Sequence, residues 1–424
     1  MQRRFFSGCL VLTAILESER NWAALTRRPL EKNMGMRHGD STGRTAAWPR
    51  LLRAGVRSGP ARLSANDART TLDKGEKRMD DMLTASAQTV LADLCTPQFV
   101  RGVEAAHDRR AGRELWRQLE ALGLLDALVP EAQGGADLPL AEAAGVLFAF
   151  GQHALPLPAA HTMIARHLLA AAGVEAPRGP VALAIADSTQ RMAFVPYGQV
   201  ADAVVVETSA GTFLVSLDTA CVEKHGEALD ATVRFDTRTA HALPARGIAE
   251  LGALVTAATM AGAMQRVLDM TTGYVNERQS FGGSPGKVQA VQQQLGVMAD
   301  HVAATRMAAQ LGCAAHRSGR QRLASAIAKA RASRAAPLVA NGAHGLVGAM
   351  GIAAGFDLQL YTRRLHAQRL QYGSESFWDE IVGTHALDHW NGVAEGVVGI
   401  FDALDEAAMP PPASSQTLAS TLHH

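Results

Sequence analysis

The sequence contains few cysteines and has almost no net charge. Its four cysteines, Cys9, Cys95, Cys221 and Cys313, lie far apart over 424 residues, without a CxxC pair or a His/Cys cluster. This spacing disfavours a structural zinc site, any other metal centre and a disulfide framework, and it is typical of a reducing compartment such as the cytoplasm. The formal net charge is +1. A nucleic-acid-binding domain usually carries a basic excess, so that class of function is disfavoured.

The N-terminal segment lacks an apolar run long enough for a membrane span. The start, MQRRFFSGCLVLTAIL, is basic and then apolar, as in a signal peptide. Its apolar run is shorter than the roughly 20 residues that a bilayer requires, and no A-x-A-like cleavage site follows. The rest of residues 1–78 is rich in Arg, Gly and Ser without apolar periodicity. We therefore expect residues 1–78 to be disordered, or translated from upstream of a start at Met79 or Met82, and we expect no membrane contact.

Aromatic residues make up only 5% of the chain, whereas Ala and Leu are abundant, which favours helices over sheets. Residues 79–178 carry apolar side chains at three- and four-residue spacing and are predicted to be helical. Residues 179–245 instead contain short β-branched stretches such as VALAIAD, ADAVVVET and GTFLVSLD, which predict a small antiparallel sheet or barrel. Residues 246–408 form four long helical patterns, typical of an antiparallel four-helix bundle, and residues 409–424 are expected to be a disordered tail. The predicted fold class is α+β.

Four motifs in this framework carry a family resemblance. They are WRQLEALGLLDALVPEAQGG, NERQSFGGSPGKVQAVQQQLGVMAD, AIAKARASRAAPLVANGAHGLVGAMG and DLQLYTRRL. In this order they resemble the elements of the acyl-CoA dehydrogenases, a flavoprotein family, over roughly residues 83–404. The resemblance implies the same three-part fold and FAD bound across the boundary between subunits of a homo- or hetero-oligomer. It also implies removal of two hydrogens from an acyl-CoA thioester, with electrons passed to an electron-transfer flavoprotein.

The resemblance also implies roles for individual residues of the glycine-rich turn. Arg278 would contact the FAD pyrophosphate, since a guanidinium fork can donate in pairs to phosphate oxygens. Phe281 would pack on the cofactor, and Gln289 would hydrogen-bond to it. The alternative is an ordinary helix end, with an arginine favoured by the helix dipole, a turn and a core phenylalanine.

A second glycine-rich stretch would approach the FAD of the neighbouring subunit. Gly345 and Gly348 coincide with family glycines, which allow close backbone approach to a cofactor. Two positions depart from the family pattern: Gly342 stands where glutamine is usual, and Leu346 where a second glycine is usual. The alternative is tight packing between helices.

The catalytic base is absent from its usual places. The family's most common position, a Glu before a glycine, is here Tyr372 before Gly373, and the less common position is Gly252. Glu375 is therefore the first candidate for the base and Glu250 the second, although either could be a solvated glutamate at a helix end. The middle segment also lacks the family's TEP..GSD and W.T elements.

Three functions remain open at this point. The first is FAD-dependent α,β-dehydrogenation of an acyl-CoA. The second is a non-catalytic or half-site subunit that completes a flavin pocket with a homologous partner, because the base is missing. The third is a fold-related flavin monooxygenase, which needs no carboxylate base.

Overall fold

The computed structural model describes most of the chain between residues 82 and 389. The segments predicted at residues 1–78 and 409–424 lie outside the described residues, as does Phe281. The described ranges are 82–106, 110–186, 192–224, 229–238, 240–279, 283–316 and 320–389.

The N-terminal part is helical, as its apolar spacing predicts. A helix over residues 82–94 comes first. Further along, Leu115, Trp116 and Leu119 form one face of an amphipathic helix and are buried in the core. The elements that follow residue 94 are α3 (Pro97–Ala106), α4 (Arg113–Ala121), η1 (Leu124–Asp126), η2 (Glu131–Gln133), α5 (Leu140–Gln152) and α6 (Ala159–Ala171).

The middle part is one seven-stranded sheet in the order β5-β6-β2-β1-β3-β4-β7. Its strands are β1 (Val181–Ala186), β2 (Met192–Val195), β3 (Ala203–Thr208), β4 (Gly211–Ser216), β5 (Cys221–Lys224), β6 (Ala231–Arg234) and β7 (His241–Leu243). The prediction of a purely antiparallel sheet is wrong at one pair, because β1 and β3 are parallel. The reason is topological: β2 pairs antiparallel to one edge of β1, and β3 then returns along the other edge. The short strands β5 and β7 were not expected.

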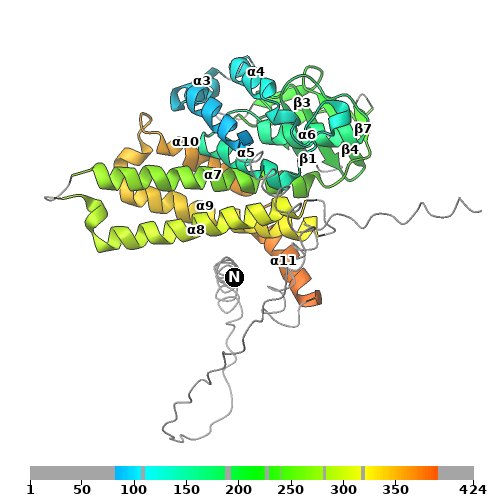
Figure 1. Ribbon diagram of the computed structural model, residues 1–424. Helices are drawn as coiled ribbons and strands as arrows, with labels where there is room; N and C mark the ends of the chain where they lie inside the picture. The colour runs from blue at the N-terminus through cyan, green and yellow to red at the C-terminus, as the bar shows by residue number, and fades with distance from the viewer. Residues whose placement is uncertain are drawn as a thin grey trace, which may run out of the picture.

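The C-terminal part is a bundle around three long helices that lie side by side (Figure 1). The shorter α10 packs against α7 and α9, and α11 packs against α9. The helical pattern expected as the fourth long helix begins at Glu375 and corresponds to α11. The elements are α7 (Ile248–Glu277), η3 (Pro285–Lys287), α8 (Gln289–Ala314), α9 (Gln321–Val347), η4 (Gly348–Ile352), α10 (Leu358–Leu370) and α11 (Glu375–His389).

Helix α7 is the centre of the molecule. By length and composition it could cross a membrane, but 78% of its most apolar window is buried inside the fold, which is the pattern of a core helix. Its close approach to α5 depends on two glycines. A Cβ atom at Gly151 would overlap the Thr259 carbonyl, and one at Gly262 would overlap the Phe148 carbonyl. Any larger residue at either position would push the two helices apart.

The two ends of α7 lie in different surroundings. The first turn follows β7, and backbone N–H groups of Gly247 and Ile248 donate to the Glu207 carboxylate of β3 at 3.2 and 2.8 Å. The last turn leads to the glycine-rich turn at the opposite end of the bundle (Figure 1). Gly252 and Arg278 are 26 residues apart, which corresponds to about 39 Å along a helix that rises about 1.5 Å per residue. The predicted base positions and the predicted pyrophosphate ligand are therefore at opposite ends of the bundle.

Candidate functional site

The two positions at which the family resemblance places a base are brought together by the fold. Tyr372 lies in the turn between α10 and α11, with a positive φ of 55°. Its ring occupies the space that a Cβ atom at Gly252 would need. Its hydroxyl donates to the Leu183 carbonyl of β1 at 2.7 Å. Strand β2 pairs with β1 only at residues 185 and 186, which leaves this carbonyl for the tyrosine.

Buried donors fix the turn that contains Tyr372. The Lys329 ammonium of α9 donates to the carbonyls of Arg369 at 2.9 Å and Gly373 at 3.0 Å. Trp378 Nε1 donates to the Tyr372 carbonyl at 3.0 Å. Lys329 is fully buried, and this burial lowers the pKa of its ammonium to about 7. Because these three carbonyls each have a donor, the tyrosine is held in one position rather than in a loose loop.

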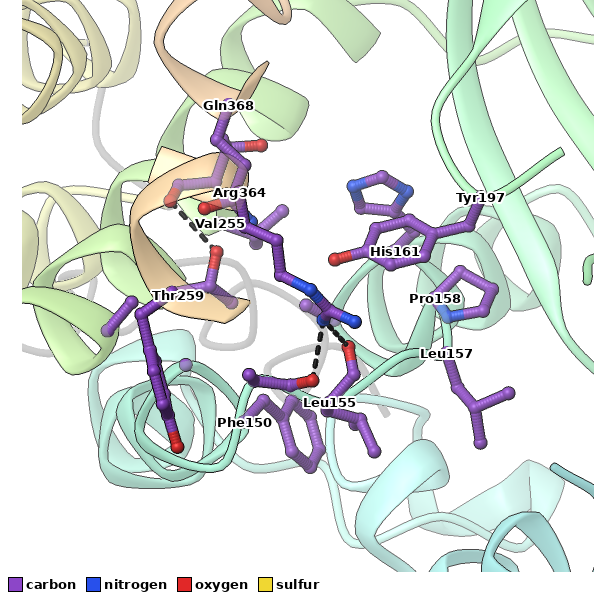
Figure 2. A pocket seen from close by; sticks show the side chains of 16 residues that line it. Phe150, Leu155, Leu157, Pro158, His161, Tyr197, Val255, Thr259, Arg364 and Gln368 are labelled. Carbon is purple, nitrogen blue, oxygen red and sulfur yellow. Dashed lines mark hydrogen bonds between the residues drawn. The ribbon is translucent and has the colours of Figure 1, made fainter. Parts of the chain in front are cut away.

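A small cavity lies between α5, α6, α7 and α10 (Figure 2), and His161 on its wall contacts Tyr372. Its volume is about 30 Å³, enough for about two water molecules. The His161 ring meets the rings of Tyr197 and Tyr372 edge-on, with centroids 5.6 and 5.7 Å apart. His161 and Tyr197 line this space, and Tyr372 supports the His161 ring. A cavity of this volume has no room for an acyl chain.

Arg364 closes the other side of this cavity (Figure 2). Its Nη1 donates to the carbonyls of Ala154 at 2.6 Å and Leu155 at 2.8 Å, and its Nη2 donates to Glu104 at 2.9 Å. Beyond it, a second hollow of about 80 Å³ is lined partly by the same Tyr197 and Arg364. The guanidinium thus forms a wall between two hollows, and its hydrogen bonds to α3 and to the α5–α6 connection keep the wall in place.

Two buried polar atoms on the cavity wall have no hydrogen-bond partner among the described residues: His161 Nδ1 and Thr256 Oγ1. Burial lowers the pKa of His161 to about 3, so the imidazole is neutral at physiological pH. A neutral imidazole and a hydroxyl suit a small neutral polar molecule such as water. They offer no carboxylate for proton abstraction.

The predicted base Glu375 lies at the first position of α11, close to this turn. Its carboxylate pairs with Arg369, whose Nε donates to the two oxygens at 3.1 and 3.0 Å and whose Nη2 makes a further close contact. The hydrogen bonds from Arg369 lower the pKa of Glu375. A base that removes an α-proton needs a desolvated carboxylate of raised pKa, so these surroundings argue against the role. Glu250 lies in the first turn of α7, 3.6 Å from the Arg322 guanidinium.

At the other end of the bundle, the predicted cofactor residues are open to solvent. Arg278 is exposed at the end of α7, and no described carboxylate forms an ion pair with it. Gln289 is the exposed first residue of α8. No side chain caps the N-terminus of α8 among the described residues. Unpaired N–H groups at a helix N-terminus together with an arginine form surroundings that favour a phosphate.

Gly345 and Gly348 also lie at this end, at the close of α9. A Cβ atom at either would meet no described atom within 4 Å, so neither glycine is needed for packing inside the described chain. Gly348 has a positive φ of 73°, which favours glycine. Gly342 differs, because a Cβ there would press on Gln294 and Met298 of α8. The glycine that departs from the family pattern thus serves helix packing, while the two matching glycines face open space.

Comparison with known proteins decides the family. The family model described as "Acyl-CoA dehydrogenase, N-terminal domain" matches residues 78–181, and the one described as "Acyl-CoA dehydrogenase, C-terminal domain" matches residues 245–387. The acyl-CoA dehydrogenase IpdE2 of Mycobacterium tuberculosis is 30% identical over 299 residues, which cover 67% of this chain and 90% of that protein. The chain belongs to the acyl-CoA dehydrogenase family.

Solved structures of this family share the fold. A variant of the Tcur3481-Tcur3483 steroid ACAD is 24% identical with a TM-score of 0.67, and the match covers 74% of this chain and 99% of that one. The ChsE4-ChsE5 complex from Mycobacterium tuberculosis is 23% identical with a TM-score of 0.62, covering 74% and 98%. The predicted family and the α+β fold are confirmed, and the enzyme class is that of oxidoreductases acting on acyl-CoA.

FAD is the cofactor of this acyl-CoA dehydrogenase, as predicted. The open end of the bundle fits its phosphates, because it carries an arginine without a described carboxylate partner and an uncapped helix N-terminus. The roles of individual residues, from Arg278 to Gly348, stay predictions. Sequence reasoning missed His161 on the cavity wall and Lys329 beneath the Tyr372 turn. A polar residue inside the apolar stretch AAHTMIA was the available signal for His161.

Proposed function

We propose that this chain is the base-lacking subunit of a heteromeric, FAD-dependent acyl-CoA dehydrogenase and that it completes the flavin site of a homologous partner chain. The observation that carries the proposal is the packing of Tyr372 on Gly252. These are the two positions at which the family resemblance places a carboxylate base, and here the tyrosine ring fills the space beside the glycine.

The chemistry explains why this packing matters. Dehydrogenation needs a carboxylate that takes the α-proton of the thioester, while the flavin accepts the β-hydride. Tyr372 cannot replace that carboxylate, because burial raises its pKa well above its ordinary value and its hydroxyl already donates to Leu183. The neighbouring cavity of about 30 Å³ is also too small for an acyl group. The thioester and the base would therefore be held by the partner chain.

The opposite end of the bundle supports the proposal that this chain completes the flavin site of a partner chain. Arg278, Gly345 and Gly348 are exposed there, and Arg278 lies about 39 Å along the α7 direction from Gly252. An extended FAD is much shorter than this separation. A flavin whose pyrophosphate is bound at Arg278 would therefore place its ring over the active site of a different chain.

The names of similar structures agree with an assembly of two different chains. The ChsE4-ChsE5 structure is described as a complex, and the Tcur structure carries two protein names and the words "steroid ACAD". By analogy, the substrate would be a CoA thioester. The electron acceptor would be an electron-transfer flavoprotein, and the complex would work in the cytoplasm.

The test is co-expression of this chain with a homologous acyl-CoA dehydrogenase encoded in an adjacent reading frame, followed by purification and acyl-CoA-dependent flavin bleaching. We expect no turnover by this chain alone and turnover by the complex. Glu375→Gln and Glu250→Gln in this chain should leave kcat within about twofold. Replacing the partner's base carboxylate by Gln should lower kcat by about 10²–10⁴-fold.

The same experiment separates the rival functions. Turnover by the isolated chain, or loss of activity on Glu375→Gln, would assign the base to this chain and overturn the half-site proposal. Oxygen consumption by the reduced flavoprotein without acyl-CoA turnover would instead point to a flavin monooxygenase.

A further inference from the structure

Tyr274 lies one turn before Arg278 at the carboxyl end of α7, next to the predicted pyrophosphate ligand. Arg278 Nη1 donates to the Tyr274 hydroxyl oxygen at 3.1 Å. The guanidinium carbon is also 5.7 Å from the centre of the Tyr274 ring, within the range of a cation–π contact. Tyr274 therefore contacts the Arg278 guanidinium both through its hydroxyl and through its ring.

The position of Arg278 at the end of a helix explains what such a contact can do. The carboxyl end of a helix carries a partial negative charge, and an arginine there tends to fold back onto the last carbonyls. The Tyr274 carbonyl already accepts the Arg278 backbone N–H at 3.0 Å. Its hydroxyl holds Nη1 as well, and among the described residues the other N–H donors of the guanidinium have no acceptor, so they can meet an anion.

Tyr274 is itself fixed by a second aromatic residue. The Phe356 ring, between η4 and α10, meets the Tyr274 ring edge-on, with centroids 5.8 Å apart and planes at 75°. Phe356 follows the segment that contains Gly348, and its backbone N–H donates to the Ala353 carbonyl at 2.9 Å. One aromatic contact therefore links the Arg278 end of α7 to the glycine-rich close of α9.

We infer that Tyr274 is a positioning residue for FAD: its hydroxyl and ring hold the Arg278 guanidinium in the orientation that binds the cofactor's pyrophosphate. The inference rests on the predicted role of Arg278. It goes beyond the proposed half-site function, because it concerns cofactor affinity whether or not the chain is catalytic alone.

The test measures binding of FAD and of riboflavin, which lacks the pyrophosphate, by flavin fluorescence anisotropy, with the full chain in its assembly with the homologous partner chain so that the ring site is present. The wild-type chain should bind FAD more tightly than riboflavin. Tyr274→Phe keeps the ring and removes the hydroxyl, and it should raise the Kd for FAD about tenfold. The Kd for riboflavin should change less than about twofold.

A double-mutant comparison separates positioning from a general structural effect. In an Arg278→Ala background, Tyr274→Phe should change the FAD Kd less than about twofold, because the residue through which Tyr274 acts is gone. Tyr361→Phe is the matched control. It removes a tyrosine hydroxyl that donates to the Gln152 carbonyl at 3.1 Å, and it should leave FAD affinity unchanged.

Several outcomes would overturn the inference. One is that the wild-type chain binds FAD and riboflavin with equal affinity. Another is that Tyr274→Phe leaves the FAD Kd unchanged, or raises the Kd for FAD and for riboflavin by the same factor. The inference would also fail if Tyr274→Phe raised the FAD Kd as much in the Arg278→Ala background as in the wild-type chain. All of these readouts are affinities, so they can be interpreted even if the isolated chain proves active and the half-site proposal fails.

Discussion

The Tyr372 ring lies directly against Gly252, across the interface between the α10–α11 turn and the first turns of α7. The contact needs a residue without a side chain on α7 and a large ring in the turn. The tyrosine hydroxyl then reaches the Leu183 carbonyl of the sheet at 2.7 Å. One side chain thus joins the bundle, the turn and the sheet at the place where related enzymes are expected to carry a base.

Gly252→Ala should destabilise the protein. The added methyl group would overlap the Tyr372 ring, which cannot move away without losing its hydrogen bond to Leu183. Overpacking of this kind costs about 1–3 kcal/mol of unfolding free energy. Urea denaturation followed by circular dichroism measures the change.

Gly273→Ala on the same helix is the matched control. A Cβ atom there would meet no described atom within 4 Å. Since alanine favours a helix over glycine by up to about 1 kcal/mol, this variant should be neutral or more stable than wild type. Equal stability of the two variants would show that Tyr372 does not press on Gly252 in solution.

Arg364→Lys should lower the unfolding free energy clearly, whereas Arg363→Lys should hardly change it. Arg364 is largely buried and donates to two carbonyls as well as to Glu104, which an ammonium cannot match with a fixed fork. We expect a loss of about 2–4 kcal/mol of unfolding free energy. Arg363 contacts the same Glu104, but its side chain is 46% exposed, so its replacement should cost less than about 1 kcal/mol.

Thermal and urea unfolding of both variants provide the measurement. A small loss for Arg364→Lys would contradict a guanidinium that acts as a fixed wall between the two hollows. In that case the two hollows could join, and the small size of the cavity would no longer exclude an acyl group from this chain.

The sequence predicted those parts of the fold that depend on local periodicity. Apolar spacing such as that of Leu115 and Leu119 was enough to predict the helices, and the four motifs in their order were enough to predict the family. The parallel pairing of β1 with β3 was not predictable, because strand order depends on contacts between distant segments. For the same reason, no local pattern could show that Tyr372 and Gly252, 120 residues apart, would touch.

His161 should make the protein sensitive to acid. Its folded pKa of about 3 lies below the ordinary value of 6.5, so the unfolded chain binds a proton between pH 6.5 and pH 3 that the folded chain does not. Stability must therefore fall as the pH is lowered through this window. His161→Phe would keep a ring against Tyr197 and Tyr372 and remove the titrating group.

Urea denaturation at about pH 7 and about pH 4.5 checks this for wild type and His161→Phe. Between the two pH values, wild type should lose about 2–3 kcal/mol more than the variant, since each unit of pKa difference corresponds to about 1.4 kcal/mol. Carboxylates that titrate in both proteins cancel in the comparison. Equal losses would mean that His161 is reached by solvent and protonated in the folded state, and that the space beside Tyr372 is open rather than sealed.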